Sequence, residues 1–437
     1  MEPVRAAPFS TPPWVAKRAP WLMFVGFLGI YLAVGVVLNT THLRRTGDVL
    51  FGSDQGRVQR DVAVFEASHY RTEAHPLFVL MMNPLGSGIK AVTGGAFAKW
   101  LNDDNRTMLV ASLLNATAGA ATIGLFMAVL LRAGLPLGLA TGFTLVLGLS
   151  SAHLFWGAIV ETHTFASTSL AVLLLLVSWP TSRFGFYALA GVMAFGVNAT
   201  SLAHAVIAQA AAIVRWDRAG VAACAARSFA LIVVILGVGA VLSLVQKAVY
   251  PSTGLFFMPE TASKEMSYVE KPVSAKGGLA RPWEIVKHQL AFNLMAPRLE
   301  VIREGYQPER PMITFQTTLA RAWSAPGWIS LALWGAVLGW GLKGVAILRH
   351  RLAMAMVGSV LFNLALFSVY GPLSEQFLYA PNTTLYVVGL AAMLLHEATR
   401  RASPRGAQVA VGLTLALAAG EAVANALFLV DVYRVYK

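Results

Sequence analysis

Two acids and two arginines follow the first apolar segment of the chain, in the stretch FGSDQGRVQRD (51–61). Carboxylates such as Asp54 and Asp61 can accept a proton from a hydroxyl group or bind a metal ion, and an arginine such as Arg57 can hold a phosphate. A solvated loop with internal ion pairs explains the same charges equally well. If the preceding segment crosses a membrane, this chemistry lies at the height of the lipid phosphates.

A second charged cluster precedes another apolar run, in RTEAHPLF (71–78). Arg71 and His75 are the residues of this cluster that could bind an anionic substrate. A histidine before proline is equally compatible with the neighbour of a helix cap. Both interpretations of His75 stay open.

Glu161 and His163 interrupt apolar sequence on both sides, in WGAIVETHTFA (156–166). A carboxylate at full depth in hydrocarbon costs up to about 3 kcal/mol, so its presence favours a functional role. The pair suits a divalent metal ion (Mg, Mn or Zn) that Asp54, Glu161 and His163 would bind, and it equally suits a simple hydrogen bond.

Two further polar stretches are NATSLAH (198–204) and GPLSEQFLYAPN (371–382). Asn198, Glu375 and Gln376 are the candidates here, because amide and carboxylate groups can bind a substrate hydroxyl or orient an arginine. Ordinary loop positions at a helix start explain these residues equally well.

Motifs of several common enzyme classes are missing from the sequence: it contains no HExxH, Walker A, GxSxG or CxxC pattern. The usual hydrolase and nucleotide-driven classes therefore lack support, and no nucleotide cofactor is expected. Glu421 lies alone in the last apolar run, where we expect a structural hydrogen bond within the bundle.

The composition is that of a polytopic membrane protein. Of the 437 residues 57% are hydrophobic and only 13% are charged, and the mean hydropathy is +0.62. The net charge of +13 comes mostly from lysines and arginines that flank apolar runs, a pattern that sets membrane orientation and does not indicate nucleic-acid binding. The single cysteine, Cys224, excludes an internal disulfide framework.

Apolar runs long enough to span a bilayer predict an all-α fold with about eleven transmembrane helices. The run at 184–214 is broken by GVNATSLAH, so it predicts two helices that meet in a hairpin near one membrane surface. The other runs lie at 21–38, 107–131, 135–156, 161–179, 228–249, 324–342, 352–371, 377–396 and 407–430.

Basic residues in the short loops predict the orientation. If eleven spans alternate, these residues lie on one side, which is the cytoplasm together with the N-terminal segment 1–20. They are Arg5, Lys17, Arg18, Arg132, Arg183, Arg215, Arg218, Arg227, Lys343, Arg349, Arg351, Arg400, Arg401 and Arg405.

Two long segments, 39–106 and 250–323, then lie on the outer face. Each is expected to carry an interfacial helix, at 76–92 and at 281–295. The predicted units are a transmembrane module at 21–249, which includes the first outer loop, the extracytoplasmic segment at 250–323, and C-terminal transmembrane helices at 324–437.

These features resemble the superfamily C glycosyltransferases (GT-C), multispan enzymes that use polyprenyl-phosphate-linked sugars. The similarity is to their protein mannosyltransferase and aminoarabinose transferase families. GSDQGRV with Asp54 matches the acidic motif of their first outer loop, HPLF (75–78) matches the start of their interfacial helix, and Glu161 matches a second acid that opens the fourth span. LAGVMAFGVNATSLAH is similar to their Gly-rich helix but lacks its lysine.

The resemblance implies transfer of a sugar, with inversion, from a polyprenyl-phosphate carrier to a glycan, lipid or protein acceptor. The active site would face outward from a bacterial cytoplasmic membrane. Asp54 would be the general base or a metal ligand, with Glu161 and His163 completing the site. Arg57 would stabilise the departing phosphate. Other expected substrate-binding residues are Arg71, His75, Asp61, Asn198, Glu375 and Gln376.

Two other classes of function stay open. A secondary transporter or lipid flippase would use the polar break at 198–204 as a binding site near the membrane midplane. A non-catalytic membrane assembly subunit could have the same fold, since a fold does not determine a function.

Overall fold

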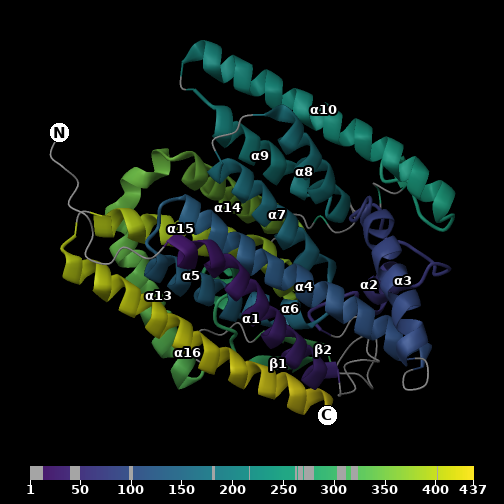
Figure 1. Ribbon diagram of the computed structural model, residues 1–437, viewed down its shortest axis with the longest axis horizontal. Helices are drawn as coiled ribbons and strands as arrows, with labels where there is room; N and C mark the ends of the chain where they lie inside the picture. Colours follow the sequence, from purple (N-terminus) through teal and green to yellow (C-terminus); the bar gives the residue numbers. More distant parts are fainter. Residues whose placement is uncertain are drawn as a thin grey trace.

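The computed structural model describes residues 13–39, 50–97, 102–179, 183–215, 217–260, 263, 269, 280–302, 312–315, 323–400 and 402–437. Helices make up most of these residues, as predicted, and the one named sheet among them is a two-stranded hairpin. The helices form a bundle in which α10 and α16 lie on opposite edges (Figure 1).

Seven helices in the described ranges are long and apolar enough to cross a membrane. They are α1 (Pro13–Asn39), α4 (Asp103–Arg132), α10 (Arg218–Val249), α13 with η4 (Ala325–Arg349), α14 (Arg351–Val369), η5 with α15 (Leu373–Arg400) and α16 (Pro404–Tyr436). This protein is therefore an all-α membrane protein.

The remaining predicted spans are also helical but are shorter or bent. Helices α5 (Leu137–Leu149) and α6 (Ser151–Ala158) meet at an angle of 57° and together form a candidate eighth span. Helices α7 (Thr162–Ser178), α8 (Phe184–Val197) and α9 (Ser201–Ile213) are apolar but have only 13 to 17 residues. The number of eleven spans stays a prediction.

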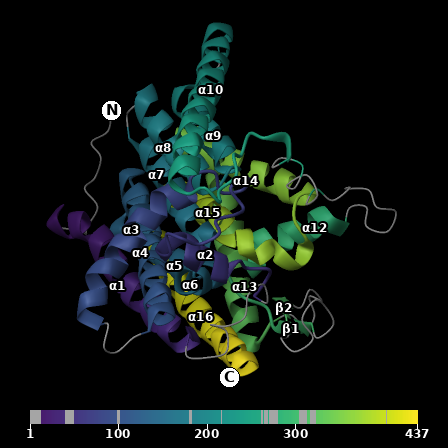
Figure 2. The ribbon, with the colours of Figure 1, turned by 90° about the vertical axis from the view of Figure 1, so that its right-hand side faces the viewer.

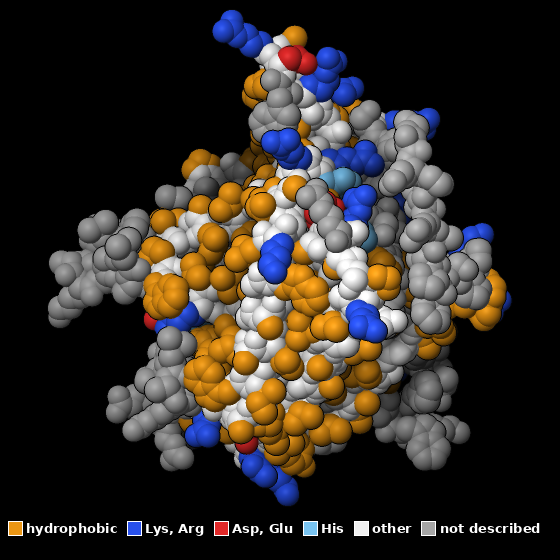
Figure 3. Space-filling model, turned by 90° about the vertical axis from the view of Figure 1, so that its left-hand side faces the viewer, with side chains coloured by type: hydrophobic (Ala, Val, Ile, Leu, Met, Phe, Trp, Pro, Cys, Tyr) orange, Lys and Arg blue, Asp and Glu red, His pale blue; other side chains and the backbone are white. Residues whose placement is uncertain are grey.

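The surface of the bundle is apolar where lipid would cover it. Large side chains of α10 such as Phe229 and Val241 are more than half exposed, and those of α1 include Trp21 and Leu22. Figure 3 shows one face of the molecule on which hydrophobic side chains cover a broad area. Apolar surface of this extent indicates a lipid environment.

Polar side chains cap the starts of two of the long helices. The Asn102 side chain accepts a hydrogen bond from Asn105 N at 2.9 Å at the start of α4, and Asp217 accepts one from Gly220 N at 2.6 Å at the start of α10. These bonds satisfy N–H groups that have no partner inside the helix. Helix α1 begins at Pro13, so the predicted 1–20 tail is partly helical.

An aromatic cluster connects the bundle to the segment before α3 that was predicted to be the first outer loop, a name kept below. The Phe51 ring lies 4.8 Å from those of Phe315 and Phe377, measured between centroids, and 5.8 Å from that of Phe155. Trp156 Nε1 donates to the Phe377 carbonyl at 2.7 Å. Since Phe51 is fully buried, it fixes the backbone three residues before Asp54.

The two predicted interfacial segments are helical. The first forms α3 (Phe78–Phe97). The second forms the short α12 (Ala280–Lys287), continued by one π-helical turn, η2 (His288–Phe292). Trp283 and Leu290 on this segment are exposed, whereas its polar residues His288 and Gln289 are buried against the bundle.

A hairpin of β1 (Leu299–Ile302) and β2 (Met312–Phe315) lies on the same side of the molecule as α12, as Figure 2 shows. The sequence did not predict it. The strands are antiparallel, and Leu50 adds a parallel bridge to Ile313. Phe51 N also donates to the Ile313 carbonyl at 3.2 Å, so the hairpin supports the loop that leads to Asp54.

The prediction for Glu421 is wrong. Its side chain is fully buried in α16, but neither carboxylate oxygen has a hydrogen-bond partner in the part of the chain that the structure describes. One helical turn later, Asn425 makes the bonds that were expected of Glu421. It accepts from Ala296 N at 3.0 Å and donates to the carbonyls of Leu149 and Leu294, each at 2.8 Å.

Candidate active site

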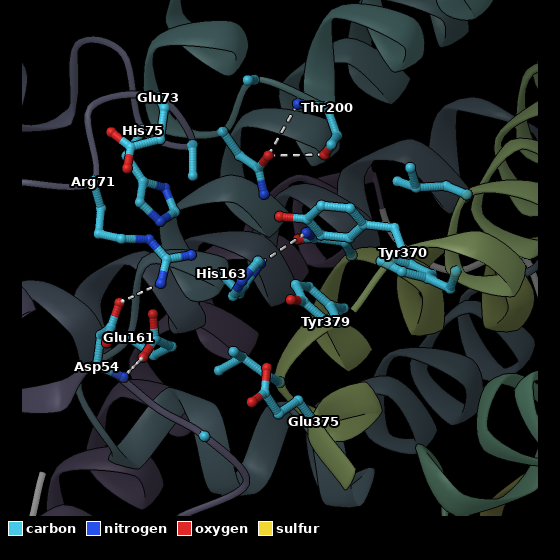
Figure 4. A pocket seen from close by; sticks show the side chains of 18 of the residues that line it. Asp54, Arg71, Glu73, His75, Glu161, His163, Thr200, Tyr370, Glu375 and Tyr379 are labelled. Atoms are coloured by element: carbon cyan, nitrogen blue, oxygen red, sulfur yellow. Dashed lines mark hydrogen bonds and ion pairs between the residues drawn. The ribbon is translucent and has the colours of Figure 1, made fainter. Parts of the chain in front are cut away.

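A cavity of about 590 Å³ opens where the first outer loop meets several helix ends. It brings together most of the residues that were selected from the sequence (Figure 4). Those that line it are Asp54, Arg57, Arg71, His75, Glu161, His163, Asn198 and Glu375. Asp61 and Gln376 do not line it, although both were expected to bind substrate.

Arg57 is held between two acids. It lies on the short helix α2 (Gln55–Ala63), where its Nε donates to Asp54 Oδ2 at 3.0 Å and its Nη1 to Asp61 Oδ2 at 2.7 Å. The Asp61 side chain is 1% exposed, and its other oxygen lies 2.8 Å from Nδ1 of His69. Asp61 therefore orients Arg57 without lining the cavity itself.

Arg57 keeps one hydrogen-bond donor unused. Its Nη2 is buried and has no partner among the described residues. Burial disfavours the charged guanidinium, but Asp54, Asp61 and Glu161 outweigh burial and raise the pKa of Arg57. Arg57 lines the cavity, and a charged guanidinium that keeps an unpaired donor favours an anion nearby.

Asp54 and Arg71 are the charged pair that a ligand can reach. Arg71 Nη1 lies 3.5 Å from Asp54 Oδ2, and the two side chains are 27% and 23% exposed. Arg71 has a φ of 65° and Phe51 a φ of 51°, both in the left-handed region that non-glycine residues rarely adopt. Such backbone strain is found preferentially at functional sites.

Glu161 fastens the loop that carries Asp54. Its Oε2 accepts a hydrogen bond from Asp54 N at 3.2 Å, and its Oε1 accepts bonds from Thr162 N and Oγ1, each at 2.7 Å. Only 2% of the residue is exposed. Burial, assisted by the negative charge of Asp54, raises the pKa of Glu161, while Arg57 and the Thr162 bonds oppose the shift.

Asn115 fixes the position of Glu161 from α4. Its side-chain nitrogen donates to three carbonyls, those of Trp156, Gly157 and Ile159, at 2.8 to 3.1 Å. Its oxygen accepts from Glu161 N at 3.2 Å. One buried asparagine therefore satisfies the backbone of the turn between α6 and α7, which positions the carboxylate.

The two predicted histidines lie side by side, with ring centroids 6.3 Å apart. His75 Nδ1 lies 2.8 Å from the Val197 carbonyl and therefore carries the proton, while Nε2 lies 3.5 Å from Thr162 Oγ1. Burial lowers the pKa of His75 well below its usual value, and Arg57, His163 and Arg71 lower it further. His75 is therefore neutral at pH 7.

Two backbone hydrogen bonds fasten the His75 segment to the turn between α8 and α9. Leu77 N donates to the Gly196 carbonyl at 2.8 Å, and Ala199 N donates to the Ala74 carbonyl at 2.9 Å. Asn198 lies in this turn, and its side-chain oxygen accepts from Thr200 N at 3.0 Å. The interruption of the long apolar run at 184–214 is therefore as predicted, and it brings Asn198 to the cavity.

Glu375 approaches the first outer loop where a glycine leaves room for it. Gly52 has a φ of +74°, and a Cβ at this position would lie 2.6 Å from Glu375 Cγ. Gln376, the next residue, instead donates from Nε2 to the Pro372 carbonyl at 3.3 Å, within its own 3-10 helix η5 (Leu373–Tyr379).

Sequence reasoning did not select several residues that line the cavity: His204, Asn363, Tyr370, Tyr379 and Asn382. Three of them lie inside stretches that had been noted, since NATSLAH ends at His204 and GPLSEQFLYAPN contains Tyr379 and Asn382. Asn363 lies in the middle of an apolar run, and a polar residue there was the available signal.

The predicted divalent-metal site gains no support from the arrangement of these side chains. No three His, Cys, Asp or Glu side chains in the described ranges are placed to share a metal ion. Asp54 faces two guanidinium groups, and His163 Nδ1 accepts from Asn382 Nδ2 at 3.2 Å. The site of Asp54, Glu161 and His163 stays a prediction.

The cavity thus combines an accessible carboxylate that can accept a proton with guanidinium groups that can hold an anion. Its walls come from the first outer loop, the start of α7, the turn between α8 and α9, and the helices α14 and α15. The chain matches no protein-family model, no curated protein and no solved structure.

Proposed function

We propose that this protein is a membrane glycosyltransferase that moves a sugar from a polyprenyl-phosphate carrier to a hydroxyl group of an envelope acceptor. One observation carries the proposal: the partly exposed pair Asp54 and Arg71 lines a cavity together with Arg57, whose buried Nη2 has no partner among the described residues, next to apolar helices. The phosphate of a lipid-linked sugar emerges from hydrocarbon at such a place. The sequence resemblance to superfamily C supports the same function.

In the proposed reaction Asp54 is the general base. Its carboxylate accepts the proton of the acceptor hydroxyl while the hydroxyl oxygen forms a bond to the anomeric carbon. The bond between that carbon and the carrier phosphate breaks, and its electron pair stays on the phosphate oxygen. Attack opposite the leaving phosphate inverts the anomeric centre. Glu161 acts as a positioning residue, because it accepts a hydrogen bond from Asp54 N at 3.2 Å and is itself buried.

The two arginines stabilise the departing phosphate. Arg71 is 27% exposed and can turn from Asp54 to the phosphate, whereas Arg57 is fixed by Asp54 and Asp61 and offers only Nη2. This division makes Arg71 the main phosphate contact, a role for which the sequence had favoured Arg57.

The ends of α7 support an extracytoplasmic cavity. The helix starts beside Glu161, and its 17 residues extend about 26 Å to Ser178. There the Arg132 guanidinium lies 4.6 Å from the centre of the Trp179 ring, and Arg351 donates to the Ser178 carbonyl at 3.5 Å. Basic residues that are expected in the cytoplasm thus lie at the end of α7 away from the cavity. We infer an outward-facing site in a bacterial cytoplasmic membrane.

A transporter or flippase is the second candidate. Its supporting observation is the interrupted helices, since α5 and α6 bend by 57° at Ser150 and the break between α8 and α9 borders the cavity. Transporters use such breaks at their binding sites. A transporter does not need a general base, so substitution of Asp54 separates the two candidates.

The test is the glycan composition of the cell envelope in a strain that lacks the protein. The strain is complemented with wild type, Asp54→Asn or Arg71→Gln at matched membrane abundance. The matched controls are Glu66→Gln and Arg60→Gln, which change exposed acidic and basic residues of the same loop and helix. We expect one sugar to disappear in the null strain and to return with wild type and both controls.

Asp54→Asn should restore at most about one hundredth of that sugar, since general-base catalysis contributes about 10²–10⁴-fold to the rate. Full restoration by Asp54→Asn would refute the enzymatic role and favour the transporter. An unchanged envelope in the null strain would refute both candidates for this linkage.

A further inference from the structure

The end of the cavity between α9, α14 and α15 differs chemically from the end that contains Asp54. The residues of these three helices that line it are His204, Asn363, Leu366, Phe367 and Asn382. None of these five is a lysine, arginine, aspartate or glutamate. This end therefore suits a part of the ligand without charge.

The hydrogen bonds of His204 leave its Nδ1 as an acceptor without a donor among the described residues. Asn363 Nδ2 donates to Thr383 Oγ1 at 3.1 Å, so its Oδ1 accepts from Nε2 of His204, also at 3.1 Å. The imidazole proton is then on Nε2, and Nδ1 can only accept. Nδ1 has no partner in the described ranges, and the ring is held by stacking on Tyr386 at 5.1 Å between centroids.

Asn382 provides a second acceptor of the same kind. Its Nδ2 donates to Nδ1 of His163 at 3.2 Å, and its Oδ1 finds no partner among the described side chains. His204 is 3% exposed and Asn382 is 6% exposed. Buried acceptors without donors are costly, so a ligand that brings hydrogen-bond donors gains affinity here.

Aromatic rings complete this end of the cavity. Tyr379 stacks on Phe367 with centroids 4.8 Å apart and meets the edge of His163 at 4.9 Å. Flat aromatic faces carry negative partial charge and attract the C–H face of a sugar ring. Acceptors that need hydroxyl donors, next to aromatic faces, are features of a site for an uncharged pyranose.

We infer that the end lined by His204 and Asn382 is a subsite for a neutral, hydroxyl-bearing sugar. Hydroxyl groups donate to His204 Nδ1 and Asn382 Oδ1, and, on the proposed function, the phosphate of the same donor lies at Arg71 and Arg57. A uronic acid would place carboxylate oxygens against acceptors. An amino sugar would bury an ammonium group on helices whose cavity residues carry no carboxylate.

The test measures binding of soluble probes to the purified full-length protein in detergent by calorimetry. The probes are inorganic phosphate, glucose 1-phosphate, mannose 1-phosphate, glucuronic acid 1-phosphate and glucosamine 1-phosphate. We expect at least one neutral sugar phosphate to bind about tenfold more tightly than inorganic phosphate. The acidic and the amino sugar phosphates should show no such gain.

His204→Gln isolates the subsite. The glutamine amide can still donate to Asn363, but the acceptor at Nδ1 is lost. The affinity of the His204→Gln variant for the neutral sugar phosphate should fall about tenfold, while its affinity for inorganic phosphate should not change. Asn382→Ser is the second variant and should show the same selective loss. The control is His396→Gln, on the same helix as Asn382 but outside the cavity.

The binding results separate the subsite from the phosphate contacts. Equal or tighter binding of the acidic or amino sugar phosphate overturns the subsite, as does unchanged affinity for the neutral sugar phosphate in both variants. If inorganic phosphate binds as tightly as every sugar phosphate, the subsite is refuted and the phosphate contacts of the proposed function stand. If no probe binds, the proposed function is refuted as well.

Discussion

At the scale of single residues, Asp61 fixes the position of the cavity residue Arg57 without lining the cavity itself. It pairs with Arg57 at 2.7 Å and with His69 at 2.8 Å, and its side chain is 1% exposed. Asp61→Asn would leave a buried guanidinium without one of its two countercharges. Because breaking a buried pair costs about 3–5 kcal/mol, we expect a clear fall in the thermal unfolding temperature of the purified protein.

The control for Asp61 is Asp103→Asn. Asp103 also pairs with two basic residues, Lys90 at 2.8 Å and Arg106 at 3.0 Å, but its side chain is 63% exposed. Exposed pairs contribute at most about 1 kcal/mol, so this variant should unfold close to the wild-type temperature. Equal effects of the two substitutions would contradict a special role of the buried pair.

His75 should make stability depend on pH. Burial, followed by Arg57, His163 and Arg71, lowers the pKa of His75 well below its usual 6.5. Below that pH His75 is protonated in the unfolded chain but not in the native state. The free energy of unfolding is therefore highest above about pH 6.5 and decreases as the pH falls. His75→Asn keeps a donor for the Val197 carbonyl but does not titrate.

The measurement is thermal unfolding of wild type and His75→Asn between about pH 5 and pH 8. The stability difference between the two should fall by up to about 1.4 kcal/mol per pH unit below about pH 6.5. A difference that stays constant over this range would show that His75 is not held neutral.

Charged residues in or next to apolar runs were the most informative part of the sequence. Glu161 stood out because a charge at the edge of hydrocarbon is costly, and Asp54 and Arg71 stood out as members of charged clusters directly beside apolar runs. Asn363 gave only a weak signal, as one uncharged polar residue within an apolar run, and Tyr379 gave none of its own, because such residues are tolerated inside helices of a bundle. Only the packing of α14 against α15 and η5 brings them to the cavity.

At the scale of elements, the fit between the first outer loop and η5 depends on Gly52. A Cβ there would lie 2.6 Å from Glu375 Cγ, and its φ of +74° is itself unfavourable for alanine. We expect Gly52→Ala to lower the unfolding temperature and to impair restoration of the envelope sugar. The matched control is Gly134→Ala, with a φ of +86° and no atom within 4 Å of the new Cβ.

Gly134→Ala should cost about 1–2 kcal/mol, which is the backbone penalty alone. Gly52→Ala should cost more, because the side chain of Glu375 must also move. If the two variants have the same stability and activity, the contact between the loop and η5 is not required.

Helix α16 allows a second comparison between two residues one turn apart. Asn425 makes three hydrogen bonds to the backbone of other segments, while Glu421 makes none with the described residues. Asn425→Leu should lower the unfolding temperature, because Ala296 N and the Leu149 carbonyl lose the bonds that Asn425 makes, at about 1–3 kcal/mol for each group left unsatisfied. The Leu294 carbonyl keeps its bond from Ser151 N at 2.9 Å. Glu421→Met should be neutral or stabilising, because it removes an unsatisfied buried group. The reverse order would contradict the hydrogen bonding described for α16.

Apolar runs predicted the helices well, whereas the sequence did not predict the hairpin of β1 and β2. Its strands have four residues each, too few for an alternating pattern to be distinguished from a loop. The paired partner of Leu50 lies at Ile313, far along the chain, and no local pattern reports such a contact.

At the scale of the whole molecule, cavity and basic residues lie at opposite ends of the helices that connect them. Helix α14 runs from Arg351 to the region of Phe367, which lines the cavity, and α15 runs from the region of Asn382 to Arg400. This arrangement agrees with the alternation of loops from which the orientation was predicted. The orientation relative to the membrane stays a prediction, which rests on all of the basic-flanked runs together.

The orientation can be tested directly because the chain has one cysteine. In a Cys224→Ser background, Ser68→Cys introduces a thiol at an exposed position of the loop after α2, on the cavity side. Ala402→Cys introduces one at an exposed position between α15 and α16, on the basic side. A membrane-impermeant maleimide should label Ser68→Cys in whole cells and Ala402→Cys only after lysis. The opposite pattern would put the cavity in the cytoplasm, where a flipped polyprenyl-phosphate sugar could not reach it, and labelling of both in whole cells would contradict the alternation of spans.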